Sequence, residues 1–459
     1  MRFSIMRPNE GSIIMIKRKI EADLVRFFND NGKYALLIDG ARQVGKTFII
    51  REFARRTYTQ FIEINFIETK GAKEIFENSA DVKEVLTKIS TFARKEIKQG
   101  KTLVFLDEIQ KCPEAVTFIK FLVEEGSCHY ILSGSLLGVE LKNIRSVPVG
   151  YMNEIKMYPI DFEEFVIANG ESKTLLDEAR KSWNEHKELD ALYHERLKKL
   201  FSLYLVVGGM PAAVQKYLDT SDISAVVRVQ QQIIALYKRD IAQYDENNAL
   251  RIRAIYDNIP RELNKKNKRF YASSIQIGTR FEHLSDEFLW LKEAGVAIPS
   301  YCVEEPSTPL RLARKSSLFK LFSNDVGLLA AQYMDGIQLD ILNGAKSINF
   351  GSVYENAVAQ ELTAHNIEPN YFNSKKQGEL DFVIEIGGNV LPIEVKSGKD
   401  YEKHAALSNV MANESYGVRE AIVFHNGNMK IKDKIIYAPI YMIMFISRIQ
   451  LPEKMLYRI

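Results

Sequence analysis

The sequence predicts an α/β multidomain protein, and three observations support this class. The chain has 459 residues, whereas a single hydrophobic core rarely grows beyond about 250–300 residues, so two or three domains are expected. Apolar runs of strand length alternate with helical patterns through residues 1–160, which is typical of a doubly wound parallel sheet. A helical pattern followed by a β-hairpin in residues 350–396 predicts a further α/β domain.

These patterns divide the chain into four parts. We expect a doubly wound core at residues 1–160, a helical connector or lid at 161–245, a winged helix at 246–335 and the further α/β domain at 336–459.

The composition is that of a folded protein, with 46% hydrophobic and 26% charged residues, and the net charge of +3 points to no particular partner. Cys112, Cys128 and Cys302 are too few and too scattered for a disulfide framework or a zinc site, which fits a reducing cytosol. The apolar run 435–446 contains Pro439 and is shorter than the roughly 20 residues that a membrane span needs. We therefore expect a cytoplasmic protein without membrane contact, in which this run is a buried strand.

The first strand, residues 34–38, leads into a loop that fits G-x-x-x-x-G-K-[ST], and a helical pattern follows. This is the P-loop pattern, in which backbone N–H groups surround phosphates at a helix N-terminus. Lys46 is expected to reach the β- and γ-phosphates and the Thr47 hydroxyl to bind magnesium, so ATP and Mg²⁺ are the expected ligands. The residues expected to contact the nucleotide are Gly40, Ala41, Arg42, Gln43, Val44, Gly45, Lys46, Thr47 and Phe48.

A second apolar strand, TLVFLDE at residues 102–108, ends in two acids and has the form of a Walker B strand. Asp107 is expected to hold the magnesium with its water shell, and Glu108 to orient or deprotonate the attacking water. After a helix at 113–125, the strand 129–135 places Ser133 near the γ-phosphate, unless this serine only starts the turn before Gly134.

Strands at 61–65 and 153–157 complete a five-stranded parallel sheet, in which the strand after Walker B lies between that strand and the P-loop strand. Lys46, Glu108 and Ser133 are thus the candidate catalytic residues of this part. Arg42 and Arg145 are candidates for an arginine finger, although a surface charge is the better interpretation of each.

Residues 161–245 read as charged helices with a break at VVGGMPAAV. Lys238 and Arg239 in this part could face a phosphate, although an exposed helical face is the better interpretation.

From residue 251 the pattern is helix, short helix, helix and two strands at 297–303 and 311–315, which suits a winged helix. Its third helix is expected to carry Phe281, Leu284, Phe288 and Leu291. A basic cluster beside it either neutralises nucleic-acid phosphates or is solvated surface: Lys265, Lys266, Lys268 and Arg269.

Two C-terminal strands, GELDFVIEI and NVLPIEVKSGK, are joined by Gly387-Gly388, a two-residue loop favoured in tight hairpins. Pairing Ile386 with Asn389 places Asp381 opposite Glu394, with Cβ atoms about 4.5–5.5 Å apart. Lys396 shares their face, and the opposite face is apolar. Either a magnesium or manganese ion between the carboxylates or Lys396 alone offsets their repulsion.

As a set, the motifs resemble a prokaryotic group of AAA-type ATPases of the archaeal-ATPase kind, whose P-loop domain precedes a winged helix and a restriction-endonuclease-like, PD-(D/E)xK, domain of unknown function. The resemblance rests on GARQVGKT, FLDEIQ, ILSGS, YPIDFEEF, VVGGMP, YKRDI, FSNDVGLL, GELDFVI and PIEVKSG. It implies the ATPase roles given above and a nuclease-like catalytic set of Glu355, Asp381, Glu394 and Lys396, with Asp381 and Glu394 as metal ligands. The sequence departs from the group at Gly150-Tyr151, where Gly-Arg is usual.

Two functions from different classes follow from this resemblance. In the first, an ATP-driven machine acts on nucleic acid, with DNA as the expected partner. In the second, a nucleotide-switched module holds a protein partner and its nuclease-like domain is inactive. Whether the chain forms a homo-oligomer stays open.

Overall fold

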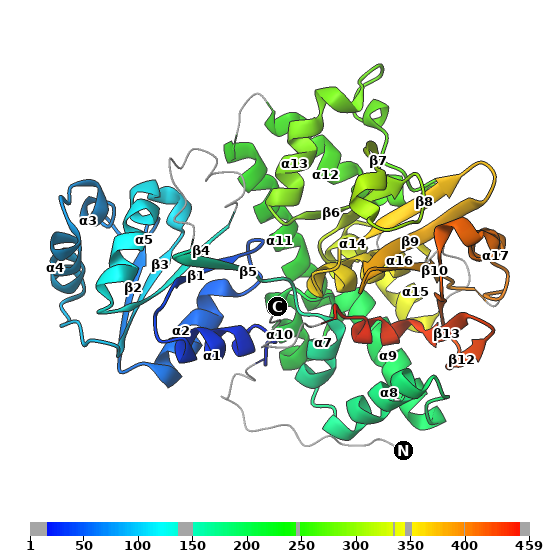
Figure 1. Ribbon diagram of the computed structural model, residues 1–459, viewed down its shortest axis with the longest axis horizontal. Coiled ribbons are helices and arrows are strands. Elements are labelled where there is room, and N and C mark those ends of the chain that lie inside the picture. The colour runs from blue at the N-terminus through cyan, green and yellow to red at the C-terminus, as the bar shows by residue number, and fades with distance from the viewer. Residues whose placement is uncertain are drawn as a thin grey trace, which may run out of the picture.

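The computed structural model describes residues 16–135, 150–244, 248–333, 336–344, 351–398 and 400–449. Within these ranges two β-sheets lie on opposite sides of the molecule in the view of Figure 1, with helices between them and also above and below the second sheet. Arg145, and residue 350 where the sequence predicts the start of a helix, fall outside the described residues.

The N-terminal sheet has five parallel strands in the order β2-β3-β4-β1-β5. Their bounds are β1 (Ala35–Asp39), β2 (Gln60–Asn65), β3 (Thr102–Asp107), β4 (His129–Gly134) and β5 (Met152–Lys156). All five predicted strands are present, and β4 lies between β3 and β1 as expected.

Helices cover both faces of this sheet, because successive strand side chains point to opposite sides. The helices are α1 (Glu21–Asn29), α2 (Lys46–Thr57), α3 (Glu74–Glu77), α4 (Val82–Ala93) and α5 (Pro113–Glu125). Leu36 and Ile38 of β1 belong to the core that α1 and α2 share, whereas Ala35 and Leu37 belong to the core of α3, α4 and α5. The doubly wound layer is therefore confirmed.

Five helices follow, as the sequence predicts for the connector: α7 (Phe162–Ala168), α8 (Lys173–Glu185), α9 (Ala191–Val207), α10 (Pro211–Thr220) and α11 (Ile223–Tyr244). The chain bends by 120° between α9 and α10, at the glycine pair Gly208-Gly209. Within the described residues no single helix has the length and apolar composition of a membrane span, and the bent pair α9 and α10 meets that test by length and composition alone.

The second sheet has eight strands in the order β12-β13-β11-β10-β9-β8-β6-β7. Their bounds are β6 (Ala297–Val303), β7 (Arg314–Ser323), β8 (Asn370–Ser374), β9 (Gly378–Ile386), β10 (Asn389–Val395), β11 (Ala421–His425), β12 (Lys430–Lys432) and β13 (Ile435–Pro439). The helices around it are α12 (Ala249–Leu263), α13 (Ser285–Glu293), α14 (Val326–Gln332), α15 (Ile337–Asn343), α16 (Gly351–Ala364) and α17 (Ala405–Ala412).

Three element boundaries differ from the prediction. The second strand of the expected winged helix begins at Arg314 and not at Arg311, because Leu310–Ala313 forms a 3-10 turn. α13 begins at Ser285, since Phe281–His283 is a separate 3-10 turn and Leu284 has non-helical dihedrals. The run 435–446 is buried but is a strand only as far as Pro439, whose missing N–H ends the ladder, and Ile440–Phe445 continues as a 3-10 helix.

The boundary predicted between residues 335 and 336 does not separate two sheets. β6 pairs in parallel with β8, so the strands of the expected winged helix extend the C-terminal sheet. One apolar cluster also runs from α2 through the connector helices to α16 and the second sheet. The winged-helix and restriction-endonuclease-like folds stay predictions.

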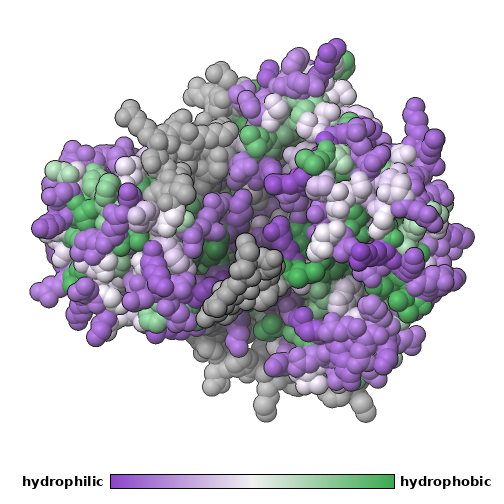
Figure 2. Space-filling model, viewed as in Figure 1, coloured by the Kyte–Doolittle hydropathy of each residue, from purple (hydrophilic) through white to green (hydrophobic). Residues whose placement is uncertain are grey.

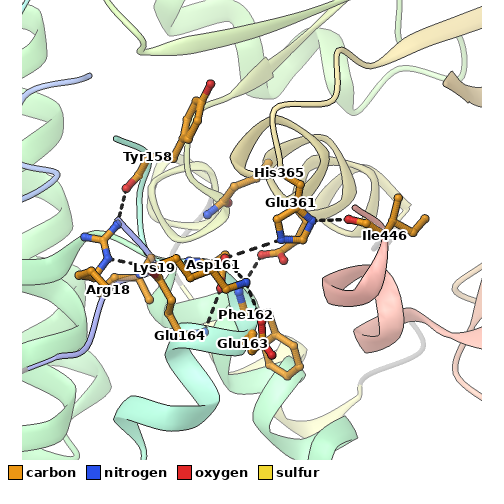
Figure 3. A network of polar contacts seen from close by, with 12 residues as sticks. Arg18, Lys19, Tyr158, Asp161, Phe162, Glu163, Glu164, Glu361, His365 and Ile446 are labelled. Carbon is orange, nitrogen blue, oxygen red and sulfur yellow. Dashed lines mark hydrogen bonds and ion pairs between the residues drawn. The ribbon is translucent and has the colours of Figure 1, made fainter. Parts of the chain in front are cut away.

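A buried polar network joins the connector to the C-terminal part (Figure 3). Lys19 Nζ lies 2.7 Å from carboxylate oxygens of both Asp161 and Glu163. Asp161 Oδ2 also faces His365 Nε2 at 3.7 Å, and Glu361 accepts a 2.9 Å hydrogen bond from the backbone N–H of Phe162. The segment YPIDFEEF therefore holds α16 against the helix that follows the first sheet.

A second contact of this kind joins two glycine-containing turns. Asp325 accepts a 2.6 Å hydrogen bond from Gly209 N, and a Cβ atom on Gly327 would lie 2.6 Å from Gly208 N. Backbone thus packs directly on backbone, which only glycine permits. This contact explains why VVGGMP and FSNDVGLL both carry glycines.

On the outside of the molecule, Figure 2 shows hydrophilic residues over much of the visible face, with apolar residues scattered among them.

Candidate functional site

The P-loop connects β1 to α2, and its two motif glycines are required by geometry. Gly40 has φ 155°, and a Cβ atom there would lie 2.2 Å from the carbonyl oxygen of Met157. Gly45 has φ 97° and directly precedes the first residue of α2. The N–H groups of the first turn of α2 consequently point out of the helix at the loop, where phosphate is favoured.

Lys46 is buried and donates from Nζ to the carbonyl oxygens of Gly40 and Ala41, at 2.7 and 2.9 Å. Burial lowers the pKa of this lysine to about 8, against the raising effect of the Glu108 and Asp39 carboxylates. An anion beside Nζ would offset that cost of burial, which is what a phosphate supplies.

The carboxyl ends of β3 and β4 bring the predicted acidic and hydroxyl side chains together. Thr47 Oγ1 donates to Asp107 Oδ2 at 3.1 Å, and the buried Ser133 hydroxyl donates to Asp107 Oδ1. Asn65, at the end of β2, also donates to Asp107 Oδ2 at 3.1 Å. An ionised carboxylate beside a threonine hydroxyl is the donor set that a hydrated Mg²⁺ takes, so these residues fit the ion.

Glu108 follows Asp107 in a left-handed conformation, with φ 56°. Its carboxylate accepts a 2.6 Å hydrogen bond from Gln110 Nε2, and Ser135 Oγ lies at 3.5 Å. Sequence reasoning missed Asn65, Gln110 and Ser135. The parallel topology could have found Asn65 and Ser135, because both stand where a strand of the same sheet ends.

Two other parts of the chain, α11 and the turn at Gly295, contact the P-loop. Arg42 forms an ion pair with Asp240 of α11, and Tyr237 donates to the Arg42 carbonyl oxygen at 3.0 Å. A Cβ atom on Gly295, in the turn between α13 and β6, would lie 3.2 Å from Ala41 N. Arg42 is thus engaged with the YKRDI segment, and its role as an arginine finger stays a prediction. Phe48, on the first turn of α2, is half exposed.

The C-terminal carboxylates lie where the predicted hairpin places them. β9 and β10 pair with Ile386 opposite Asn389 and Phe382 opposite Ile393, which makes Asp381 the neighbour of Glu394. Lys396 Nζ lies 2.7 Å from Glu394 Oε2, and Asp381 Oδ2 accepts from Val395 N at 2.9 Å. Burial and the Asp381 charge raise the pKa of Glu394 to about 8.

Two lysines that the sequence did not assign to this cluster bind its fourth member, Glu355 of α16. Lys268 forms an ion pair with Glu355 Oε1, and the fully buried Lys320 of β7 lies 3.7 Å from Glu355 Oε2. Lys320 also lies 2.8 Å from Glu379 Oε1. We call Glu355, Glu379, Asp381, Glu394, Lys268, Lys320 and Lys396 the lysine–carboxylate cluster.

The negative charge of the carboxylates in the lysine–carboxylate cluster is largely neutralised by the lysines of the same cluster. Across the described ranges, no three Asp, Glu, His or Cys side chains are gathered closely enough to hold a metal ion. In this arrangement Lys396 lies against Glu394 and neutralises it, and metal binding by Asp381 and Glu394 stays a prediction.

Two of the four residues of the predicted basic cluster form ion pairs with carboxylates of the described part of the chain, and the other two do not. Lys265 pairs with Glu262 at 2.5 Å and Lys268 with Glu355, whereas Lys266 and Arg269 form no ion pair with the described residues. Lys238 of α11 is partly buried and pairs with Asp257 at 2.6 Å.

Comparison with known families gives three matches. Residues 32–166 match a family described as an AAA domain. Residues 198–339 and 350–443 match two families described as domains of unknown function, DUF8612 and DUF4143. No curated protein matches the sequence.

Solved structures of similar fold include the Walker-type ATPase PABY2304 of Pyrococcus abyssi, at 15% identity and a TM-score of 0.46, covering 72% of this chain and 99% of that one. Cdc6p from Pyrobaculum aerophilum has 13% identity and a TM-score of 0.27, covering 73% and 97%. The Aeropyrum pernix ORC1 protein in complex with DNA has 12% identity and a TM-score of 0.29, covering 72% and 94%. These similarities are too distant to carry a functional argument.

Proposed function

We propose that the chain hydrolyses ATP and couples this hydrolysis to action on nucleic acid. The proposal starts from the N-terminal part, which is a P-loop AAA-type ATPase domain. The observation that carries the ATPase proposal is the convergence of Thr47, Ser133 and Glu108 around Asp107. These four residues lie at the carboxyl edge of the parallel sheet, beside the N-terminus of α2, where α/β proteins bind phosphate ligands.

Each side chain has a role that its contacts support. Lys46 would exchange the Gly40 and Ala41 carbonyls for phosphate oxygens, and Ser133 holds the Asp107 carboxylate in place. Glu108 is an oriented carboxylate able to take a proton from the attacking water, with Gln110 fixing one of its oxygens. Thr47 and Asp107 would hold Mg²⁺, which when bound supplies charge neutralisation for the phosphates.

The nucleic-acid part of the proposal rests on cations without carboxylate partners. Lys266 and Arg269 follow α12, and Arg269 and Arg280 both line one hollow. Because these charges are uncompensated by the described residues, a polyanion would neutralise them. We infer that the part of the chain that carries these cations grips nucleic acid.

Two other proposals remain in competition. Metal-dependent cleavage at Asp381 and Glu394 would need a cation to displace Lys396 from Glu394. A nucleotide-switched module that holds a protein partner is favoured by the same charge balance, because a lysine-filled cluster need not face a nucleic acid at all.

ATP turnover with and without DNA distinguishes these proposals. Lys46→Ala should lose ATP binding, and Glu108→Gln should bind ATP with near-normal affinity but turn it over slowly, because the amide keeps the shape and loses the base. Asp381→Ala should keep ATP turnover and serves as the control. Stimulation of the wild-type ATPase by DNA supports the first proposal, and an ATPase indifferent to DNA contradicts it. DNA cleavage in magnesium or manganese that Asp381→Ala abolishes would instead support the nuclease.

A further inference from the structure

The segment that follows α12 connects the unpaired cations to the lysine–carboxylate cluster. Arg269 forms an isolated antiparallel bridge with Lys320, and Phe270 N donates to the carbonyl oxygen of Phe319 at 2.9 Å. This segment therefore runs along β7, the last strand of the eight-stranded sheet. We call residues 266–270 the strap.

The strap places Lys268 in the cluster, where it is one of two cations beside Glu355. The side chains of Lys268 and Glu355 are 15% and 2% exposed, whereas Lys320 is fully buried. If Lys268 left, Glu355 would keep Lys320 at 3.7 Å, so the carboxylate would not become an isolated buried charge. Of the two lysines, Lys268 is consequently the one that solvent reaches and that the cluster can release.

The other cations of the strap, together with Arg280, indicate what would attract Lys268. Arg269 and Arg280 line a hollow of about 310 Å³ together with Tyr271, a residue that is 39% exposed. The Arg269 guanidinium lies 5.6 Å from the centre of that ring. Like Lys266, both arginines lack an ion pair with any described residue. Closely spaced free cations beside an exposed aromatic ring suit a phosphate backbone whose bases can stack.

We propose that Lys268 is a latch: in the free chain it neutralises Glu355, and when nucleic-acid phosphates lie along Lys266, Arg269 and Arg280 it exchanges Glu355 for a phosphate. This inference rests on the proposed action on nucleic acid and adds its mechanism. The cost of breaking the Lys268–Glu355 pair opposes binding, and release of the latch exposes Glu355 beside the bound backbone. The two regions that the sequence suggested separately, the basic cluster and the acidic cluster, are then one site.

The test measures binding of a fluorescent oligo-dT strand to the full-length protein by anisotropy, over a series of salt concentrations. Glu355→Gln keeps the shape of the side chain but removes the charge that holds Lys268, so binding should tighten several-fold. Lys268→Gln should bind more weakly, and the slope of log K against log salt should fall by about 0.7, the value for one single-strand phosphate contact. Glu304→Gln is the matched control, because it frees Lys315 from a 3.1 Å ion pair elsewhere on β7 and should change neither quantity.

Two results would overturn the latch. The first result needs a wild-type protein that binds the strand and whose ATPase responds to DNA. If Glu355→Gln then binds the strand with wild-type affinity and Lys268→Gln keeps the wild-type salt slope, the latch is wrong and the proposed function stands. If the wild-type protein binds neither oligo-dT nor its duplex, the proposed function fails and the latch with it. Circular dichroism and ATP affinity of both variants show whether a change in binding comes from misfolding.

Discussion

Glu361 makes the joint between α16 and the connector sensitive to pH. Its side chain is fully buried and accepts hydrogen bonds from Phe162 N and the Tyr204 hydroxyl, at 2.9 and 3.1 Å. Burial and the charge of Asp161 raise its pKa from 4.5 to about 7. Because the folded state holds this proton more tightly, the stabilising contribution is fully present below about pH 4.5 and is lost as the pH rises through about 7.

At about 1.4 kcal/mol per pH unit, a rise from 4.5 to about 7 amounts to at most about 3 kcal/mol of unfolding free energy. His365 acts in the same direction. Burial disfavours its charged form, yet the hydrogen bond to Asp161 and the charges of Glu361 and Asp161 raise its pKa, so its contribution is also lost as the pH rises. Figure 3 shows both side chains facing Asp161.

Glu361→Gln should therefore flatten the pH dependence of stability without abolishing it. The amide can still accept both hydrogen bonds but no longer titrates, and His365 continues to do so. Urea denaturation between about pH 5 and 9 should show the wild type losing stability relative to Glu361→Gln as the pH rises. Glu195→Gln on the exposed face of α9 is the control. Parallel curves for the wild type and Glu361→Gln would refute the reasoning.

Three further outcomes are expected. Asp240→Asn should weaken ATP binding several-fold in calorimetry, because Arg42 of the P-loop loses its ion pair with α11. The control Asp257→Asn breaks the ion pair of Lys238, also on α11, and should leave ATP binding unchanged. Equal effects of the two variants would contradict a role of the Arg42–Asp240 pair in ATP binding. Gly209→Ala should lower the melting temperature sharply, since its Cβ atom would lie 2.0 Å from the Ile160 carbonyl oxygen. The control Gly398→Ala should not, because its Cβ atom would meet nothing within 4 Å. Similar melting temperatures of the two variants would count against the contact. Lys320→Met should lower the unfolding free energy in urea denaturation by up to about 3 kcal/mol, because the buried Glu355 then keeps only Lys268 as a cation. Adding Glu355→Gln should recover part of this loss, and no recovery would contradict the pairing.

The first sheet and the C-terminal hairpin could be predicted because local rules determine them. The two-residue loop Gly387-Gly388 fixes the register of β9 and β10, and that register places Asp381 beside Glu394. Likewise, the carboxyl ends of parallel strands meet at one edge, which brings Ser133 to Asp107.

The contacts that the sequence did not reveal join residues far apart in the chain. Arg42 and Asp240 are separated by 198 positions, and Gly209 and Asp325 by 116. Lys320 lies in KSSLFKLFS, which reads as an ordinary strand, and its burial against Glu355 depends on where β7 joins the sheet. Such pairs follow from tertiary packing, which no local period or turn signal encodes.

The pairing of β6 with β8 limits how this chain can be cut into fragments. A truncation after residue 335 would strip β8 and the five strands beyond it from β6, and each fragment would present an unpaired strand edge to solvent. Exposed edges of this kind recruit other chains and cause aggregation. The C-terminal part is therefore not a module that can be expressed, lost or exchanged independently at that boundary. Any recombination that preserves the fold has to carry residues 297–323 together with the strands that follow them.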